Sequence, residues 1–163
     1  MPWVAALAVA VAVACAAGLW WFWPASPEPW ADPDDDRLVA LGKVVYEERC
    51  AVCHGTRLEG EPDWQTRKPD GLLPAPPHDA TGHSWHHPDA QLFAITKYGI
   101  GRFAPPGYRS AMPAFEEVLT DAEIWAALAY IKSHWPARER AFQAQMNPPG
   151  ADQGNRKKPA TVK

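Results

Sequence analysis

The sequence has little cysteine, with three residues in a chain of 163, and its one close cysteine pair is Cys50 and Cys53. A structural zinc site needs about four ligands, which usually come from two such clusters. A zinc site would therefore have to recruit histidines from the segment between His78 and His87. A disulfide between Cys50 and Cys53 would gain little loop-closure entropy, because it closes a very short loop.

The sequence also lacks the patterns of strands and of repeats. No run alternates between apolar and polar residues as a half-buried strand does, and no self-similar period recurs. A thioredoxin-like redox pair lies between a strand and a helix in an alternating β/α chain, so the two cysteines do not fit that kind of site. These absences predict an all-α domain.

An excess of positive charge is confined to the C-terminal end. The net charge of −3 divides into −7 for residues 1–135 and +4 for residues 136–163. An acidic body argues against nucleic acid as a partner. The basic end contains proline and glycine and few apolar residues, a composition typical of solvated chain. We therefore expect residues 137–163 to be a disordered tail.

The N-terminal end has no charged side chain from residue 3 to residue 23. At about 1.5 Å per residue, a helix of this length spans roughly 31 Å, the thickness of the hydrocarbon core of a bilayer. Trp20, Trp21 and Trp23 would lie at the interface, where aromatic residues are enriched. We expect residues 1–23 to form a transmembrane anchor and residues 24–33 to form a Pro-rich linker.

A cleaved secretory signal is the alternative for the same segment. Small residues such as Ala14 and Ala16 would offer a cleavage site, but no Lys or Arg precedes the apolar run. Cys15 resembles the attachment cysteine of lipoproteins, although Ala12 stands where a larger aliphatic residue is usual. A small buried hydrophobe is the simpler interpretation of Cys15.

Three helices are predicted after the linker, over about residues 34–50, 87–99 and 120–135. The third has the clearest start, because Thr120 and Glu123 form a capping-box pattern before a run of apolar residues at helical spacing. Long loops rich in proline and glycine join these helices. Loops of more than about 15 residues are uncommon in a compact domain unless something orders them, so a group other than side chains should fill the centre.

Cys50, Cys53 and His54 form a C-x-x-C-H motif, the signature of covalent haem attachment. On a helical turn they occupy positions i, i+3 and i+4, so all three project from one face. The two sulfurs can then bond the two vinyl-derived positions of one porphyrin while the imidazole lies beneath its iron. The motif therefore predicts one covalent haem c, bound through both cysteines and ligated by His54.

Met112 is the expected second axial ligand. Met1 belongs to the predicted anchor and Met146 to the predicted tail, whereas Met112 lies in a loop between the second and third helices. Pro113 follows it, and a residue before proline is biased toward an extended backbone, which suits a thioether held over a ring. A methionine that fills a gap in the core is the alternative.

With these motifs in this order, residues 34–136 resemble a small monohaem class I c-type cytochrome. The marks are CAVCHG after a first helix, MP in a distal loop and LTDAEIWAALAYIKSHW as the last helix. The resemblance implies three to five helices around one covalent haem, and the apolar N-terminus adds one transmembrane helix before them. In this family the first and last helices cross closely. Gly42 and Tyr46 match the first-helix positions, with Leu128 and Tyr130 or Ile131 as their partners.

The family also has a proline-bearing loop, where a backbone carbonyl binds the second ring nitrogen of the proximal histidine and fixes its tautomer. Pro76 or Pro77, in LLPAPPH, would supply this carbonyl for His54. The polar insertion at residues 60–71, which contains Trp64, departs from the family pattern, and its role stays open.

The segment GHSWHHPD concentrates histidines before the second helix. Its side chains can be read as polar loop residues near a helix start. Trp85 and His83, together with Arg102 from the distal loop, are candidates to contact haem propionates. A second metal site for copper is the further alternative, using His83, His86 and His87.

Axial ligation by His54 and Met112 would leave no open position at the iron, which favours one-electron transfer over catalysis. We therefore predict an electron carrier rather than an enzyme, anchored by a single span in the inner membrane with its haem domain in the periplasm. Its partners would be redox proteins in or at the membrane. The alternatives are a haem enzyme or gas sensor in which Met112 is displaced, and a copper-handling protein.

Overall fold

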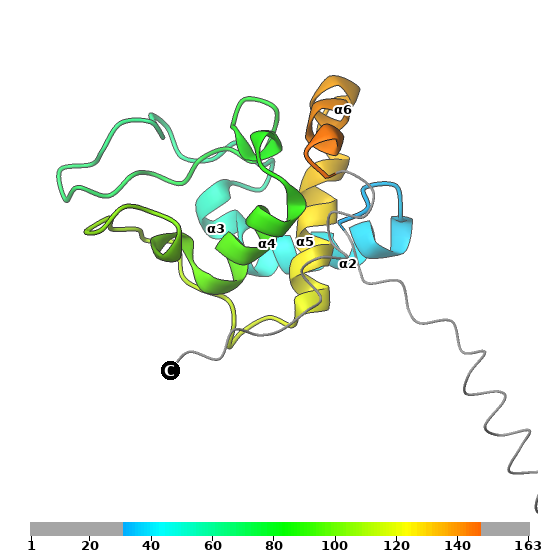
Figure 1. Cartoon of the computed structure of the whole chain (residues 1–163), viewed down its shortest axis with the longest axis horizontal. Coiled ribbons are helices and arrows are strands. Elements are labelled where there is room, and N and C mark those ends of the chain that lie inside the picture. Colours follow the sequence, from blue (N-terminus) through cyan, green and yellow to red (C-terminus); the bar gives the residue numbers. More distant parts are fainter. Residues whose placement is uncertain (1–30, 148–163) are drawn as a thin grey trace, which may run out of the picture.

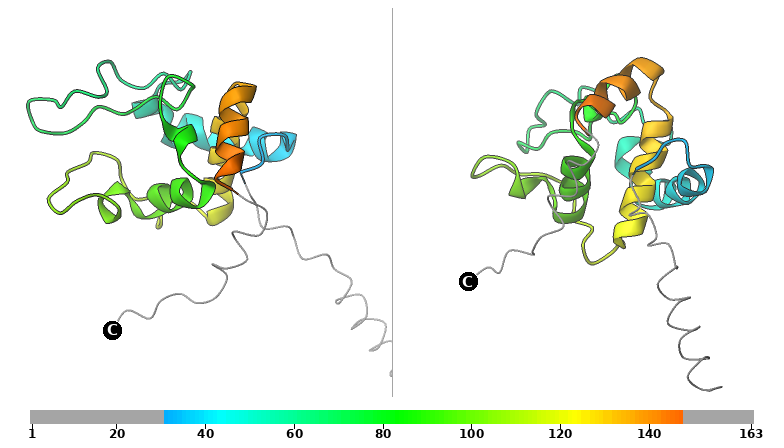
Figure 2. Two further views of the ribbon diagram at one scale, coloured as in Figure 1. Left: turned by 45° about the horizontal axis from the view of Figure 1, so that its top comes forward. Right: turned by 45° about the vertical axis from the view of Figure 1, so that its right-hand side comes forward.

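The computed structural model describes residues 31–147. Its α-helices are α2 (Asp36–Arg49), α3 (Ala51–His54), α4 (Asp89–Tyr98), α5 (Asp121–Ser133) and α6 (Ala137–Gln145), with short 3-10 turns η1 (Ser84–His86) and η2 (Ile100–Arg102) (Figure 1). The described part of the chain contains no strand, as the sequence predicts. Long loops leave the helices on one side of the molecule, away from α5 and α6 (Figures 1 and 2).

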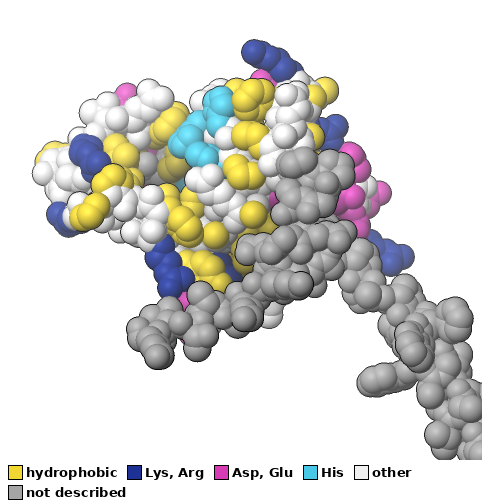
Figure 3. Space-filling model, viewed as in Figure 1, with side chains coloured by type: hydrophobic (Ala, Val, Ile, Leu, Met, Phe, Trp, Pro, Cys, Tyr) yellow, Lys and Arg dark blue, Asp and Glu magenta, His cyan; other side chains and the backbone are white. Residues whose placement is uncertain are grey.

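The three predicted helices are confirmed close to their expected bounds. The side chain of Asp35 caps α2 by accepting hydrogen bonds from the backbone N–H groups of Arg37 and Leu38. Acidic side chains gather at the surface over the start of this helix, where the helix dipole favours them (Figure 3). The predicted capping box of Thr120 and Glu123 starts α5, with both reciprocal hydrogen bonds present.

Helices α2 and α5 cross at very close range. A Cβ atom at Gly42 would overlap the carbonyl oxygen of Ala126 and lie 2.9 Å from Cβ of Tyr130. Tyr46 is fully buried, and its ring centroid lies 5.3 Å from that of Tyr130. Of the partners that the resemblance allows, Tyr130 therefore packs on Tyr46, while Ala126 faces Gly42. The absence of a side chain at Gly42 is what permits this approach.

Residues 137–147 differ from the expectation of a disordered tail, because residues 137–145 form α6. Gln143 is 1% exposed, and its side-chain amide donates hydrogen bonds to the carbonyl of His87 and to the carboxylate of Asp89. The side chain of Asn147 accepts a hydrogen bond from the backbone N–H of Asp89. The expectation was wrong because polar contacts hold this segment, and a charged sequence without an apolar stripe does not reveal them.

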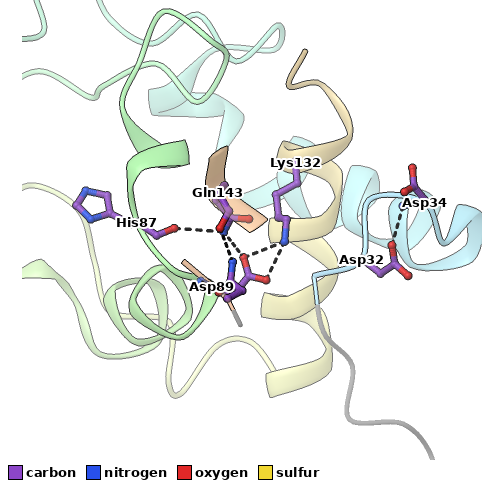
Figure 4. A network of polar contacts seen from close by, with 7 residues as sticks. Asp32, Asp34, His87, Asp89, Lys132 and Gln143 are labelled. Carbon is purple, nitrogen blue, oxygen red and sulfur yellow. Dashed lines mark hydrogen bonds and ion pairs between the residues drawn. The ribbon is translucent and has the colours of Figure 1, made fainter. Parts of the chain in front are cut away.

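A buried ion pair joins α4 to α5 beneath α6. Nζ of Lys132 lies 2.7 Å and 2.9 Å from the two carboxylate oxygens of Asp89, and the two side chains are 10% and 7% exposed (Figure 4). Gln143 donates to the same carboxylate at 2.6 Å. Every buried side-chain nitrogen and oxygen in the described residues has a hydrogen-bond partner. The three helices are therefore locked together by one polar cluster.

None of the helices within residues 31–147 is long and apolar enough to cross a membrane. The predicted anchor at residues 1–23, and with it Cys15, lies outside the described residues. The same holds for most of the predicted linker and for residues 148–163.

Candidate functional site

Cys50, Cys53 and His54 lie on a single turn at the junction of α2 and α3. The backbone N–H of Cys50 donates to the carbonyl of Tyr46 at 2.8 Å. The carbonyl of Cys50 accepts from the backbone N–H groups of Cys53 and His54, at 3.1 Å and 2.9 Å. Both cysteines are free thiols. The local backbone thus gives the three side chains the helical spacing that the motif predicts.

The ring of His54 is fixed by one hydrogen bond. Its Nδ1 lies 2.8 Å from the carbonyl oxygen of Pro76, and because a carbonyl only accepts, Nδ1 carries the proton. Burial lowers the pKa of His54, while the hydrogen bond to Pro76 and the charge of Glu61 act in the opposite direction. The imidazole is therefore neutral at pH 7, and its Nε2 has the free lone pair that a metal ligand needs.

His78 supports this ring from one face. Its imidazole stacks on that of His54 with centroids 3.9 Å apart, and its Nδ1 lies 2.9 Å from the hydroxyl of Ser84. Burial, together with the nearby rings of His54 and His83, lowers the pKa of His78 well below its usual range. Sequence reasoning did not find this role, because the stacking depends on how residues 55–78 fold back and has no local signal.

The described residues give no support to the competing metal-site interpretations of the two cysteines and the nearby histidines. Burial, and next the neighbouring Cys53, raise the pKa of Cys50 to about 11, so this residue is a neutral thiol at pH 7. Across residues 31–147, moreover, no group of three or more His, Cys, Asp or Glu side chains is arranged to hold a metal ion. The zinc and copper interpretations therefore gain no support.

Met112 is half-buried and packs against the hydrophobic core. Cys50 is also half-buried and packs against the same core. The backbone N–H of Met112 donates to the hydroxyl of Ser110 at 3.0 Å. Just beyond it, the N–H of Phe115 bonds the carbonyls of Thr96 and Lys97 in α4. The segment that follows Met112 is therefore tied to α4.

Trp85 and Arg102, the residues predicted to contact haem propionates, each have contacts within the protein. The indole N–H of Trp85 points to the carbonyl of Ala80 at 3.4 Å, and its ring packs on those of His86 and Phe142. The guanidinium of Arg102 lies 4.8 Å above the ring of Tyr98 in α4. Their role toward haem propionates stays a prediction.

His83 lies with Trp64 rather than with a metal-ligand set. The two rings are nearly parallel, 4° apart in orientation, with centroids 5.5 Å apart. The ring of His87 meets that of His83 edge-on at 5.3 Å. Trp64, the residue of the insertion whose role stayed open, therefore packs on the histidine-rich segment.

The side chains present fit a covalently bound haem. Two free thiols three residues apart would hold it through thioether bonds, and the neutral imidazole of His54 would bind its iron through Nε2. Leu92 and Phe93 of α4 are half-buried and pack against the same hydrophobic core as Cys50 and Met112.

Comparison with known families agrees with this chemistry. Residues 39–135 match the family model described as Cytochrome c, which implies haem c bound covalently through the two cysteines. Comparisons with curated proteins and with solved structures give no significant match. The matched segment is more than half of the 163 residues and contains Cys50, Cys53, His54 and Met112. The chain therefore belongs to the cytochrome c family.

Proposed function

We propose that this chain is a membrane-tethered, periplasmic one-electron carrier with a single haem c, ligated by His54 and Met112. The hydrogen bond from His54 Nδ1 to the carbonyl of Pro76 is the observation that carries the proposal. It selects the tautomer in which only Nε2 can bind iron, and it gives the imidazole a fixed orientation. The chain contains one C-x-x-C-H motif, which supports one haem.

The iron of a bound haem c supplies a reversible one-electron change. The residues of this chain set the conditions for that change. His54 would occupy one axial side, and the thioether of Met112 would close the other, so that neither dioxygen nor a substrate has a position to bind. A thioether and imidazole pair also raises the reduction potential relative to two imidazoles. Electron transfer, the usual role in this family, is thus favoured over catalysis.

The membrane tether rests on the sequence of residues 3–23, which is long and uncharged enough to span a bilayer. A linker of about ten residues would let the domain reach redox proteins in the same membrane, and electron-transfer encounters need only small, transient interfaces. The partners are therefore redox proteins in or at the membrane, on the periplasmic side.

The proposal is tested on protein made in a host that matures c-type cytochromes, after separation of membrane and soluble fractions. We expect a coloured protein in the membrane fraction, whose oxidised spectrum shows the long-wavelength sulfur-to-iron band and whose reduced form binds carbon monoxide slowly. A pigment confined to the soluble fraction would contradict the tether. Rapid carbon monoxide binding by the reduced parent protein would instead support the haem enzyme or gas sensor.

A further inference from the structure

The 60–71 insertion is an ordered loop with its own hydrogen bonds. The backbone N–H of Lys68 donates to the carbonyl of Leu72 at 2.8 Å, and its ammonium group lies 2.8 Å from the carboxylate of Glu61. The N–H of Glu61 donates to the carbonyl of Ala75 at 2.9 Å. A loop closed in this way can transmit a constraint from its base to its tip.

The base of the insertion is attached beside the proximal histidine. The N–H of Gly60 donates to the carbonyl of His54 at 2.8 Å. A Cβ atom at Gly60 would lie 2.5 Å from the backbone nitrogen of Pro77, so the chain passes directly against the loop that holds the ring of His54. The φ angle of 67° at Gly60 also favours glycine.

The tip of the insertion contacts the segment that carries Met112. The guanidinium of Arg67, held by a 2.7 Å hydrogen bond to the carbonyl of Gly71, lies 5.6 Å from the ring centroid of Tyr108. From the segment that carries Met112, the guanidinium of Arg109 donates a 3.1 Å hydrogen bond to the carbonyl of Asp70 in the insertion. Both loops extend on the same side of the molecule, away from α5 and α6 (Figures 1 and 2).

We infer that the 60–71 insertion holds the Met112 loop, residues 103–112, in place, and that Arg67, Tyr108 and Arg109 are positioning residues for Met112. The inference rests on the proposed ligation by Met112. Among the described residues, the other hydrogen bonds of this loop are local. The N–H groups of Phe103 and Ala104 donate to the carbonyl of Ile100, the N–H of Tyr108 donates to Pro105, and the N–H of Met112 donates to Ser110. The contacts of Tyr108 with Arg67 and of Arg109 with Asp70 are therefore the long-range contacts of this loop on the N-terminal side of Met112.

The expected effect follows from the number and kind of these ties. A cation–π contact and a charged hydrogen bond at a partly exposed site each shift an equilibrium by about threefold. Loss of both should raise the fraction of molecules with Met112 dissociated by on the order of tenfold. The attachment of haem and the packing of α2 on α5 do not depend on these ties.

The test compares the haem-loaded parent protein with Tyr108→Leu/Arg109→Ala. We expect the reduced variant to bind carbon monoxide about tenfold faster than the parent protein does. The oxidised variant should lose its sulfur-to-iron band at a pH about one unit lower than the parent, because about one pH unit corresponds to a tenfold shift of the equilibrium. Arg57→Ala, an exposed arginine whose ion pair is with Glu59, is the matched control and should behave like the parent.

Suppose that the parent protein shows the sulfur-to-iron band, and that the variant binds carbon monoxide at the parent's rate and loses the band at the parent's pH. This result would overturn the inference about the insertion and leave ligation by Met112 standing. A parent without the band would overturn both. Arg67→Ala and Tyr108→Leu, separately and combined, form a double-mutant cycle. Because the two side chains touch, their effects on the carbon monoxide rate should be less than additive, and full additivity would contradict the contact's role.

Discussion

His78 lies face to face with His54, with ring centroids 3.9 Å apart and planes inclined by 22°. The carbonyl of His78 accepts a 2.8 Å hydrogen bond from the indole N–H of Trp135, just after α5. The position of the His54 ring is therefore set from two sides, by the Pro76 carbonyl and by a stacked ring that is attached to the end of α5. This arrangement joins the site to the packing of the helices.

Replacement of His78 by alanine should destabilise the domain by about 2–4 kcal/mol, because it removes a packed ring and leaves a cavity beside His54. Urea unfolding of the haem-loaded protein measures the loss. The control is His134, an exposed histidine at the C-terminal cap of α5. Its replacement by alanine should lower the free energy of unfolding by less than about 1 kcal/mol. Equal losses for the two variants would show that the stacked ring has no special role.

Gly42→Ala should cost at least about 3 kcal/mol, since the added Cβ overlaps a backbone carbonyl that cannot rotate away. The helices α2 and α5 would have to separate. Gly101→Ala is the control, because a Cβ there meets nothing within 4 Å. Thermal unfolding of the two variants checks this prediction, and a stable Gly42→Ala protein would mean that the helices cross less closely than described.

Asp89→Ala should cost about 3–5 kcal/mol, because it leaves the ammonium group of Lys132 buried without its partner. Lys132→Met alone should have a similar effect through the unpaired carboxylate. The double variant Asp89→Leu/Lys132→Met should recover most of the loss in urea unfolding, since both charges are then absent. If the double variant is no more stable than the single ones, the polar cluster contributes something other than charge pairing.

Met112→Ala should leave haem covalently attached, lower the reduction potential and open the iron to carbon monoxide. Potentiometric titration and the oxidised spectrum report these changes together. Met146→Ala, which alters a methionine at the end of α6, is the control and should keep the potential of the parent. A Met112→Ala protein that retains the sulfur-to-iron band would show that another side chain is the second axial ligand.

The sequence was most informative where local chemistry decides the structure. The bounds of α2, α4 and α5 follow from Asp35, from Pro88 and Gly99, and from the capping box at Thr120. The turn that bears Cys50, Cys53 and His54 is likewise local. Residues 39–135 belong to the cytochrome c family, as the motif predicts.

Long-range polar contacts were beyond the reach of the sequence pattern. Helix α6 is held by Gln143 and Asn147 against Asp89, and the hydropathy of a charged segment does not reveal such partners. The choice between Pro76 and Pro77 depends on how the loop returns to His54. The ties between the 60–71 insertion and the Met112 loop join residues about 40 apart in the chain, so no spacing rule predicts them.

The covalent attachment of haem through Cys50 and Cys53 is tested by the mass of the purified protein in acidified organic solvent. We predict the mass of the polypeptide plus one haem, and no pigment released into the solvent. A Cys50→Ala/Cys53→Ala protein should carry no covalent haem and should not reach the stable fold of the parent. A polypeptide mass without haem in the parent protein, with the pigment free in the solvent, would contradict the proposed site.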